Sequence, residues 1–529
     1  MATTKFNSVH EYPLDTSLPI SPTSKSLFTP SLLKFRKDTS ILDDMKSDME
    51  VTLIEPVPLV KREMRESLAI LPDELSGEEG EGHGHNSGPL KSSIFISSLN
   101  IINTCLGAGI LELAYVMRQF GILLSIVIFV ISYLLCVCSC FLLLKAKNLS
   151  GHSKYSTIGV SAIGNIGEKV IKFMVIVNNF GLCIVYLILF GKTSHNILCI
   201  IFSSTPQDAF LISPKFLIPI VALIMLPLVF AKKMARLKIV SVVAVSAITL
   251  FSLLTVFTFI RKWAQGTLPG NINILPSSDF SFVDALSCVP TVFLAFTFQF
   301  NYFPVYKSLA DANDHRMRKV TLISLSSVLA FYVIVAFCGY LSYGNAITSG
   351  GLIDNFTKED LSTPVYIILM SSFLTSSTLC FPMMFFGARN NIWSVVLSIT
   401  KHVNKSWKNA SQVEQVNDNS TDQILKTPLI RNTATAVVSW KYYFIYVLIL
   451  YVLVILSAMY ATGIGEILNI VGAVAANAIS YVFPALFYVR LSKSQNKKWR
   501  RISYFMLVFG VICGGISLVM SIISFIKKN

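Results

Sequence analysis

Residues 93–117 read SIFISSLNIINTCLGAGILELAYVM, and this stretch decides the fold. A helix needs about 20 predominantly apolar residues to cross a bilayer, so the stretch is long enough to span one. It is nevertheless a poor continuous helix, because Gly107 and Gly109 each weaken a helix by about 1 kcal/mol relative to alanine. Asn100 and Asn103 add polar side chains that can bond to any freed backbone groups. The pattern predicts a membrane helix that is interrupted near its middle.

The composition of the whole chain agrees with a membrane protein. Of its 529 residues 53% are hydrophobic and 14% are charged, roughly half the charged share of about 25% in soluble proteins. This excludes an ordinary water-soluble enzyme. The net charge of +15 does not indicate a nucleic-acid partner, because residues 1–92 carry −5 and the remaining +20 lies between long apolar runs.

Ten further apolar runs follow the first one. Only helices can satisfy every backbone group of such a run in lipid, so the chain is predicted to be an all-α membrane protein with eleven transmembrane helices. The predicted helices lie near residues 93–117, 121–144, 170–202, 214–231, 236–260, 281–304, 319–343, 363–387, 441–462, 464–490 and 502–525.

The loops between these runs predict the orientation. With the N-terminus in the cytosol, the inner loops hold 26 Lys and Arg residues, against eight in the outer loops and the C-terminus. Residues 1–92 are acidic and rich in proline, lack an apolar signal-peptide core and are predicted to be a disordered cytosolic tail. Residues 93–525 form the predicted transmembrane transporter domain.

A second run, residues 281–304, is also a poor continuous helix. It contains Pro290 and Pro304, which remove helical hydrogen bonds, and Gln299 and Asn301, which are costly in lipid unless they face a cavity. The two poor helices are the first of spans 1–5 and the first of spans 6–10. A repeated five-helix unit must insert upside down, and interrupted helices at matching positions indicate a binding site at the membrane midplane. The alternative is that the glycines only allow close helix packing.

Four motifs in this order resemble the amino acid/auxin permease family, and within it the sodium-coupled neutral amino acid transporters. The resemblance covers residues 93 to 525. The motifs are SLNIINTCLGAGILELAYVM in the first span, FTFQFNYFPVYKSL in the sixth, LTSSTLCFPMMFFGAR in the eighth and IVGAVAANAISYVFPALFYVRL in the tenth.

The resemblance implies a five-plus-five inverted repeat, discontinuous helices 1 and 6, and an eleventh helix outside the repeat. It also implies that the broken helices bind the amino and carboxylate groups of a substrate. Half-helix N-termini attract a carboxylate, which supports this reading independently. The implied substrate-binding residues are Thr104, Leu106, Gly107, Ala108 and Gly109, with Phe296, Thr297 and Gln299 opposite.

The sequence does not decide whether the coupling ion is Na⁺ or H⁺. In the sodium-coupled members an asparagine and a threonine hold the ion, which implies a sodium site of Asn103 and Thr378 with Ser377 and Thr375 nearby. Glu112 departs from the family pattern and is a candidate proton site, unless it merely faces water in an outer vestibule. The outer segment 261–280 is also shorter than in the sodium-coupled animal members and has no cysteine.

We therefore predict a secondary active transporter of amino acids, more specifically neutral ones, that works by alternating access as a symporter with Na⁺ or H⁺. An amino-acid sensor that signals through its N-terminal tail is the alternative. No catalytic motif and no cofactor other than the ion is predicted. The expected partners are a small amino acid and the bilayer of the plasma membrane or of a vacuole or lysosome. Of five glycosylation sequons, only Asn355 lies in a predicted outer loop.

Overall fold

The computed structural model describes residues 91–202, 212–230, 237–276, 281–348, 350–357, 360–414, 440–461, 463–492 and 496–528. The predicted disordered tail lies outside these residues except for its last two. The described part is helical: it contains no strand, and one isolated β-bridge joins Ser92 to Leu309. Nine of the described helices are long and apolar enough to cross a membrane, and two shorter apolar helices, Ile94–Cys105 and Pro214–Pro227, add to them.

The first predicted helix is interrupted. Helix α3 (Ile94–Cys105) begins after Ser93, whose hydroxyl accepts a hydrogen bond from the backbone of Ile96. Three residues separate the end of α3 from the start of helix α4 (Gly109–Ser150). A second break inside α4 falls at Gly121, which has a φ of 73° and lies against the backbone of Leu275. Residues 109–120 therefore continue the first predicted span, and those after Gly121 form the second.

The sixth predicted helix is interrupted as well, although not at its prolines. Helix α9 (Phe282–Ala295) runs through Pro290, and the 3₁₀ turn η2 (Gln299–Asn301) leads into α10 (Tyr302–Ser308). Pro304 lies in the first turn of α10, where a missing N–H costs little. The break falls between the two prolines, at Phe296 to Phe298.

The remaining predicted spans contain helices too, and the structure differs from the prediction in three places. The predicted inner loop before α6 contains the short helix α5. The eighth helix continues well past residue 387, because residues 388–414 contain neither glycine nor proline. The tenth is α-helical only at its ends, with two π-helical turns, η5 (Gly472–Ala476) and η6 (Ala478–Val482), between them. These helices are α5 (Tyr155–Ile163), α6 (Asn165–Ile201), α7 (Pro214–Val229), α8 (Leu237–Ala264), α11 (Asp314–Tyr343), α12 (Thr363–Glu414), α13 (Trp440–Tyr460), α14 (Ile464–Val471), α15 (Phe483–Leu491) and α16 (Lys497–Lys528).

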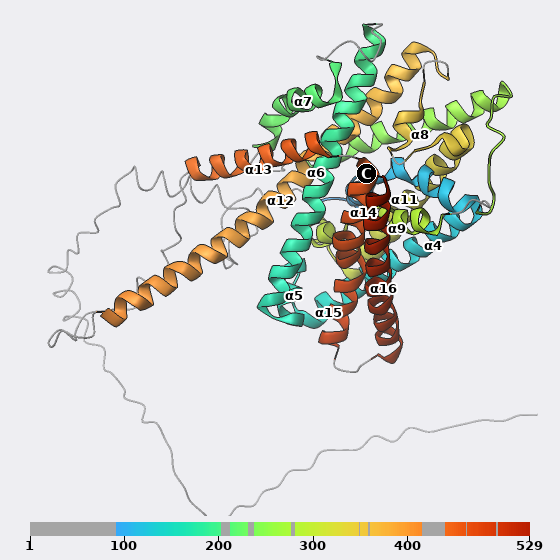
Figure 1. Cartoon of the computed structure of the whole chain (residues 1–529). Helices are drawn as coiled ribbons and strands as arrows, with labels where there is room; N and C mark the ends of the chain where they lie inside the picture. Colours follow the sequence, from blue (N-terminus) through green and yellow to red (C-terminus); the bar gives the residue numbers. More distant parts are fainter. Residues whose placement is uncertain are drawn as a thin grey trace, which may run out of the picture. The chain divides into compact units, whose positions relative to one another are not determined.

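The broken helices lie in the interior. In the apolar window of Phe282–Ser308, 72% of the residues are buried, against 28% in α13 and α16. Helix α6 packs along α12, α4 packs along α11 and α9, and α16 packs against α14 and α15 (Figure 1). Because α13 and α16 expose most of their apolar side chains, those faces suit contact with lipid.

Candidate functional site

The two helix breaks lie against each other. The side-chain amide of Asn301, from η2, donates to the hydroxyl of Thr104 at 3.2 Å. That hydroxyl in turn donates to the backbone carbonyl of Asn100 in the preceding turn of α3 at 2.9 Å. A Cβ added to Gly109 would lie 3.1 Å from the Cβ of Ala295, at the end of α9. The first residue of α4 and the last of α9 therefore approach as closely as glycine and alanine allow.

A tyrosine of α11 connects the two breaks. The hydroxyl of Tyr332 lies 2.7 Å from the carbonyl oxygen of Cys105 and 2.6 Å from that of Ala295. These are the last residues of α3 and α9, and the final carbonyls of a helix lack partners within the helix. The fully buried Tyr332 thus shares its single hydroxyl proton between the last carbonyl groups of both half-helices.

The break after α9 is held by a network of buried polar side chains. The hydroxyls of Thr297 and Ser480, the latter in η6, lie 2.8 Å apart. Ser480 donates to the side-chain carbonyl of Gln299 at 2.9 Å, which also accepts from the backbone of Phe298. The amide nitrogen of Gln299 lies 3.3 Å from the sulfur of Cys136 in α4. Gln299 is fully buried, so its cost in lipid is offset by these bonds.

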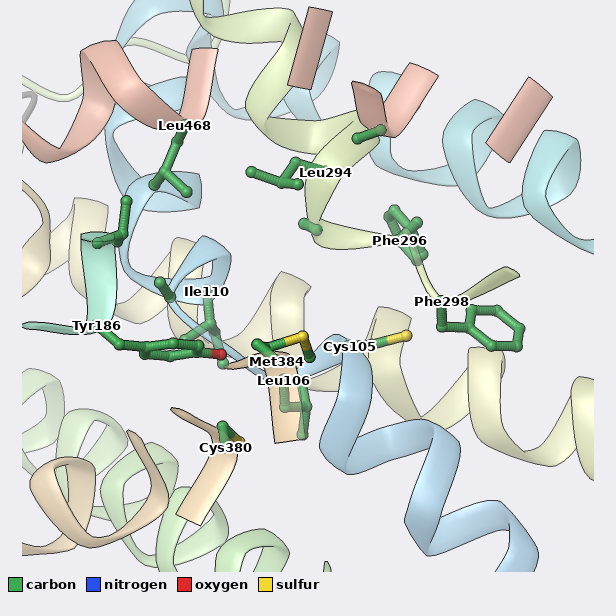
Figure 2. Packing of buried hydrophobic residues seen from close by; sticks show 14 of the residues in the cluster. Cys105, Leu106, Ile110, Tyr186, Leu294, Phe296, Phe298, Cys380, Met384 and Leu468 are labelled. Carbon is green, nitrogen blue, oxygen red and sulfur yellow. The ribbon is translucent and has the colours of Figure 1, made fainter. Parts of the chain in front are cut away.

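On the other side of the first break, α6 supplies a tyrosine. A Cβ added to Gly107 would overlap the hydroxyl of Tyr186, which also interacts with the backbone of Ala108. Figure 2 shows this hydroxyl directed at the break, with Cys380 of α12 close by. The predicted residues Leu106 and Phe296 are both buried in the same region.

The predicted sodium ligands are only partly brought together. The side chain of Asn103 contacts α12 through sulfur: its oxygen accepts from the Cys380 thiol at 3.3 Å and its nitrogen lies 3.4 Å from the Met383 sulfur. The hydroxyl of Thr378 donates to the backbone of Leu374 in its own helix at 2.7 Å.

The other two candidate ligands differ from each other in exposure. Ser377 is buried, whereas Thr375 is exposed and bonds to the backbone of Ser371. In this conformation α12 therefore presents sulfur rather than hydroxyl groups to Asn103.

Glu112 lies one turn after Gly109 and is only 2% exposed. The loop between α11 and α12 covers it, because a Cβ on Gly351 would lie 3.6 Å from a carboxylate oxygen of Glu112. The alternative in which Glu112 faces a watery vestibule does not describe this conformation. Among the described residues no group of three or more His, Cys, Asp or Glu side chains could hold a metal ion.

The predicted glycosylation site is in the same loop, where Asn355 ends the 3₁₀ turn η4 (Leu352–Asn355). Its side chain is half-buried and donates to the carbonyl of Ala346 at 3.0 Å. Of the other sequons, Asn148 bonds to Asp314 at 2.6 Å, and the side chains of the remaining three lie outside the described residues.

Several residues of this arrangement had not been predicted from the sequence. Each is a common residue in an apolar run, where packing is the usual role. Only the motifs could have indicated some of them, because Cys380 and Met383 lie in the threonine-rich motif and Ser480 lies in the motif of the tenth span. The residues are Cys136, Tyr186, Tyr332, Cys380, Met383 and Ser480.

Comparison with known proteins places the chain in a family. The family described as transmembrane amino acid transporter protein matches residues 90–527. Amino acid transporter AVT6E of Arabidopsis thaliana is 25% identical over 457 residues, covering 84% of this chain and 86% of that protein. Sodium-coupled neutral amino acid symporter 2 of Danio rerio is 24% identical over 431 residues, covering 78% of each chain.

A further relative and one solved structure are also similar. Vacuolar amino acid transporter 6 of Saccharomyces cerevisiae is 23% identical and covers 77% of this chain and 92% of its own length. Among solved structures, MhsT in complex with L-phenylalanine superposes with a TM-score of 0.49 at 12% identity, covering 82% of this chain and all of that one. The family match spans nearly all the described residues, so the resemblance predicted from the four motifs is confirmed. The chain belongs to the transmembrane amino acid transporter family, whose members are transporters and not enzymes.

Proposed function

We propose that this chain is a secondary active transporter of neutral amino acids that works by alternating access. One observation carries the proposal: the breaks of α3/α4 and α9/α10 face each other in the buried interior, linked by Asn301, Thr104 and Tyr332. A packing protein has no need of two opposed breaks, whereas a midplane binding site uses the backbone groups that they free.

The breaks provide complementary groups for an amino acid. The N-terminus of α4 at Gly109 offers backbone N–H groups and a partial positive charge to the substrate carboxylate. The ends of α3 and α9 offer carbonyl oxygens to its amino group. The proposed ligands are those predicted from the resemblance, from Thr104 to Gly109 and from Phe296 to Gln299. Leu106, Phe296, Thr297 and Gln299 are uncharged, which favours a neutral substrate side chain.

The proposed ligands are buried in the conformation that the structure represents. Leu106, Ala108, Phe296 and Gln299 are each at most 1% exposed. A substrate can reach them only after helices move, which is the requirement of alternating access. We propose that each five-helix half, inverted with respect to the other, moves as a unit, with α16 as the eleventh helix outside.

The coupling ion is Na⁺ or H⁺ in this proposal. Na⁺ is a hard cation that binds oxygen rather than sulfur. A sodium site at Asn103 therefore requires α12 to shift so that Thr378, instead of Cys380 and Met383, faces the amide. Glu112, buried beside the first break, is the proposed proton site if H⁺ couples.

Uptake of radiolabelled neutral L-amino acids into proteoliposomes tests the function, with sodium and proton gradients imposed separately. If sodium couples, Thr378→Ala should raise the half-saturating sodium concentration several-fold, and Glu112→Gln should leave it unchanged. If protons couple, Glu112→Gln should flatten the pH dependence and Thr378→Ala should leave it intact. Uptake that ignores both gradients would refute the symport mechanism and favour the sensor.

The membrane and the orientation belong to the same proposal. The relatives include vacuolar and sodium-coupled transporters, so the plasma membrane and a vacuolar or lysosomal membrane are both consistent with them. The proposed orientation keeps the N-terminus in the cytosol, as the distribution of Lys and Arg indicates.

A further inference from the structure

A row of polar residues follows one face of α6 from Lys172 to Thr193. Lys172, Asn179, Tyr186 and Thr193 are spaced by seven residues, nearly two helical turns, so they lie on the same face. Asn179 and Thr193 are fully buried, and Tyr186 is 1% exposed. Polar residues are costly inside a membrane span, so a buried row of them is a candidate for a functional pathway.

Helix α12 presents a matching row in the reverse direction. Lys172 donates to the hydroxyl of Ser394 at 2.7 Å. Seven residues earlier in α12, a Cβ on Gly387 would overlap the amide nitrogen of Asn179. The charge of Lys172 is balanced by Glu168 at 2.6 Å, so this end of the row has no net charge.

The third level of the row reaches the first helix break. Cys380 lies seven residues before Gly387, interacts with the Tyr186 side chain and donates to Asn103. The Tyr186 hydroxyl touches Gly107. We call the six residues Lys172, Asn179, Tyr186, Cys380, Gly387 and Ser394 the α6–α12 seam. It connects the candidate ion site to the predicted inner face, with levels about 10 Å apart.

Asn179, at the middle of the seam, and its neighbour Asn178 have unsatisfied polar atoms. The amide nitrogen of Asn178 donates to the side-chain oxygen of Asn179 at 3.2 Å, and both residues are fully buried. The remaining oxygen of Asn178 and nitrogen of Asn179 have no hydrogen-bond partner among the described residues. Buried polar atoms are nearly always bonded, and an acceptor beside a donor suits a water molecule or the hydration shell of a small cation.

We propose that the α6–α12 seam is a hydrated route for the coupling cation between the first helix break and the inner face. The Asn178–Asn179 pair holds its water, Tyr186 and Cys380 close the route at the break, and Lys172 and Ser394 close it at the inner end. This proposal rests on the proposed function. It adds a cation route distinct from the path of the amino acid.

The test separates net cation movement from substrate exchange in proteoliposomes. The full chain carrying Asn179→Leu, which replaces the amide with an apolar group, should lose at least fivefold of its gradient-driven uptake of radiolabelled neutral L-amino acids. Its counterflow, in which loaded carrier exchanges substrate without net cation release, should stay within twofold of the unmodified chain. Parallel sodium and proton gradients show which cation uses the seam.

Two further variants control the result. Gly387→Ala, which places a methyl group on the Asn179 amide, should give the same pattern. Asn196→Leu makes the same chemical change as Asn179→Leu on α6 but outside the row, and both activities should be retained. Unchanged gradient-driven uptake in Asn179→Leu, or an equal loss of uptake and counterflow, would overturn the route. An unmodified chain without any uptake would refute the proposed function itself.

Discussion

At the scale of single residues, the glycines of the first break act through their size. The helix-weakening effect of glycine predicted the interruption, but neither Gly107 nor Gly109 has a positive φ. What the structure requires at both positions is the absence of a side chain. The hydroxyl of Tyr186 occupies the space beside Gly107, and Ala295 occupies the space beside Gly109.

This predicts a specific pair of variants. Gly107→Ala should lower amino-acid uptake at least tenfold, because its methyl group overlaps the Tyr186 hydroxyl, and Gly107→Leu should abolish uptake. Adding Tyr186→Phe to Gly107→Ala removes that oxygen and should recover uptake at least threefold. Uptake is measured at matched amounts of reconstituted protein.

Gly515→Ala is the matched control for this experiment. Gly515 lies in α16, and a Cβ there meets open space, so the same substitution should leave uptake unchanged. Full activity of Gly107→Leu would show that the first break does not line the transport path.

The contacts of Asn103 could not be predicted from the sequence, because they too depend on tertiary packing. The resemblance indicated Thr378 as its partner, yet Cys380 and Met383 contact it in the structure. On a helix, two residues of separation turn a side chain to almost the opposite face. Which face of α12 packs against α3 therefore depends on tertiary packing, which a sequence motif does not determine.

At the scale of elements, the two broken helices depend on a third helix. Tyr332 in the middle of α11 supports the ends of α3 and α9 at once. Removing its hydroxyl leaves the buried carbonyl of Ala295 without that donor, whereas the carbonyl of Cys105 keeps a hydrogen bond from the backbone of Gly107 at 2.7 Å. An unsatisfied buried group costs about 1–3 kcal/mol.

Tyr332→Phe should therefore lower the melting temperature of the detergent-solubilised protein and reduce uptake. Tyr133→Phe serves as the control, because the Tyr133 hydroxyl forms an exposed bond with Ser326 at 3.1 Å. An equal melting temperature for both variants would contradict a role of Tyr332 in supporting the breaks.

The segment before α12 is attached to α8 and α11 by one carboxylate. Asp360 lies 2.8 Å from Lys262, accepts from Tyr343 at 3.0 Å and accepts from Thr357 at 2.9 Å. Burial opposes ionisation of Asp360, but the hydrogen bonds from Lys262 and Thr357 and the charge of Lys262 hold its pKa below the usual range. The ionised form is thus favoured in the folded protein.

The lowered pKa of Asp360 predicts how the stability of the protein depends on pH. A lowered pKa in the folded state stabilises the protein above the unfolded value of about 3.9, and the contribution is lost as the pH falls through the folded pKa. Asp360→Asn should lower the melting temperature at pH 7, and its difference from the unmodified protein should shrink towards pH 3.

Asp311→Asn, at a carboxylate that is 81% exposed, should change little across the same range. A difference between Asp360→Asn and the unmodified protein that stays constant with pH would contradict this account.

The elements themselves were largely predictable. The length of the apolar runs and the weak helix formers near residues 107 and 299 indicated where helices form and where two of them break. The π-helical turns of η5 and η6 and the continuation of α9 through Pro290 were not indicated. Both depend on close contacts between distant segments, such as the approach of Gly472 to the carbonyl of Pro290, which local propensity does not contain.

At the scale of the whole molecule, the inverted repeat and the orientation stay predictions. They rest on the odd number of spans in each proposed half and on the excess of Lys and Arg in the proposed inner loops. The structure adds a position for the loop between α11 and α12, which covers Glu112 and carries Asn355. If the proposed orientation is correct, this loop lies outside the cytosol.

Glycosylation tests the orientation of the entire chain. Asn355 is the only one of the five sequons that the proposed topology exposes to the lumen or exterior, so it alone should carry a glycan. Asn355→Gln should remove the shift in gel mobility that glycosidase treatment removes. Asn404→Gln, Asn409→Gln and Asn419→Gln, in the proposed cytosolic loop, should leave mobility unchanged. Since all spans are connected, a glycan on any of these three would place that loop outside and invert every helix of the proposed arrangement.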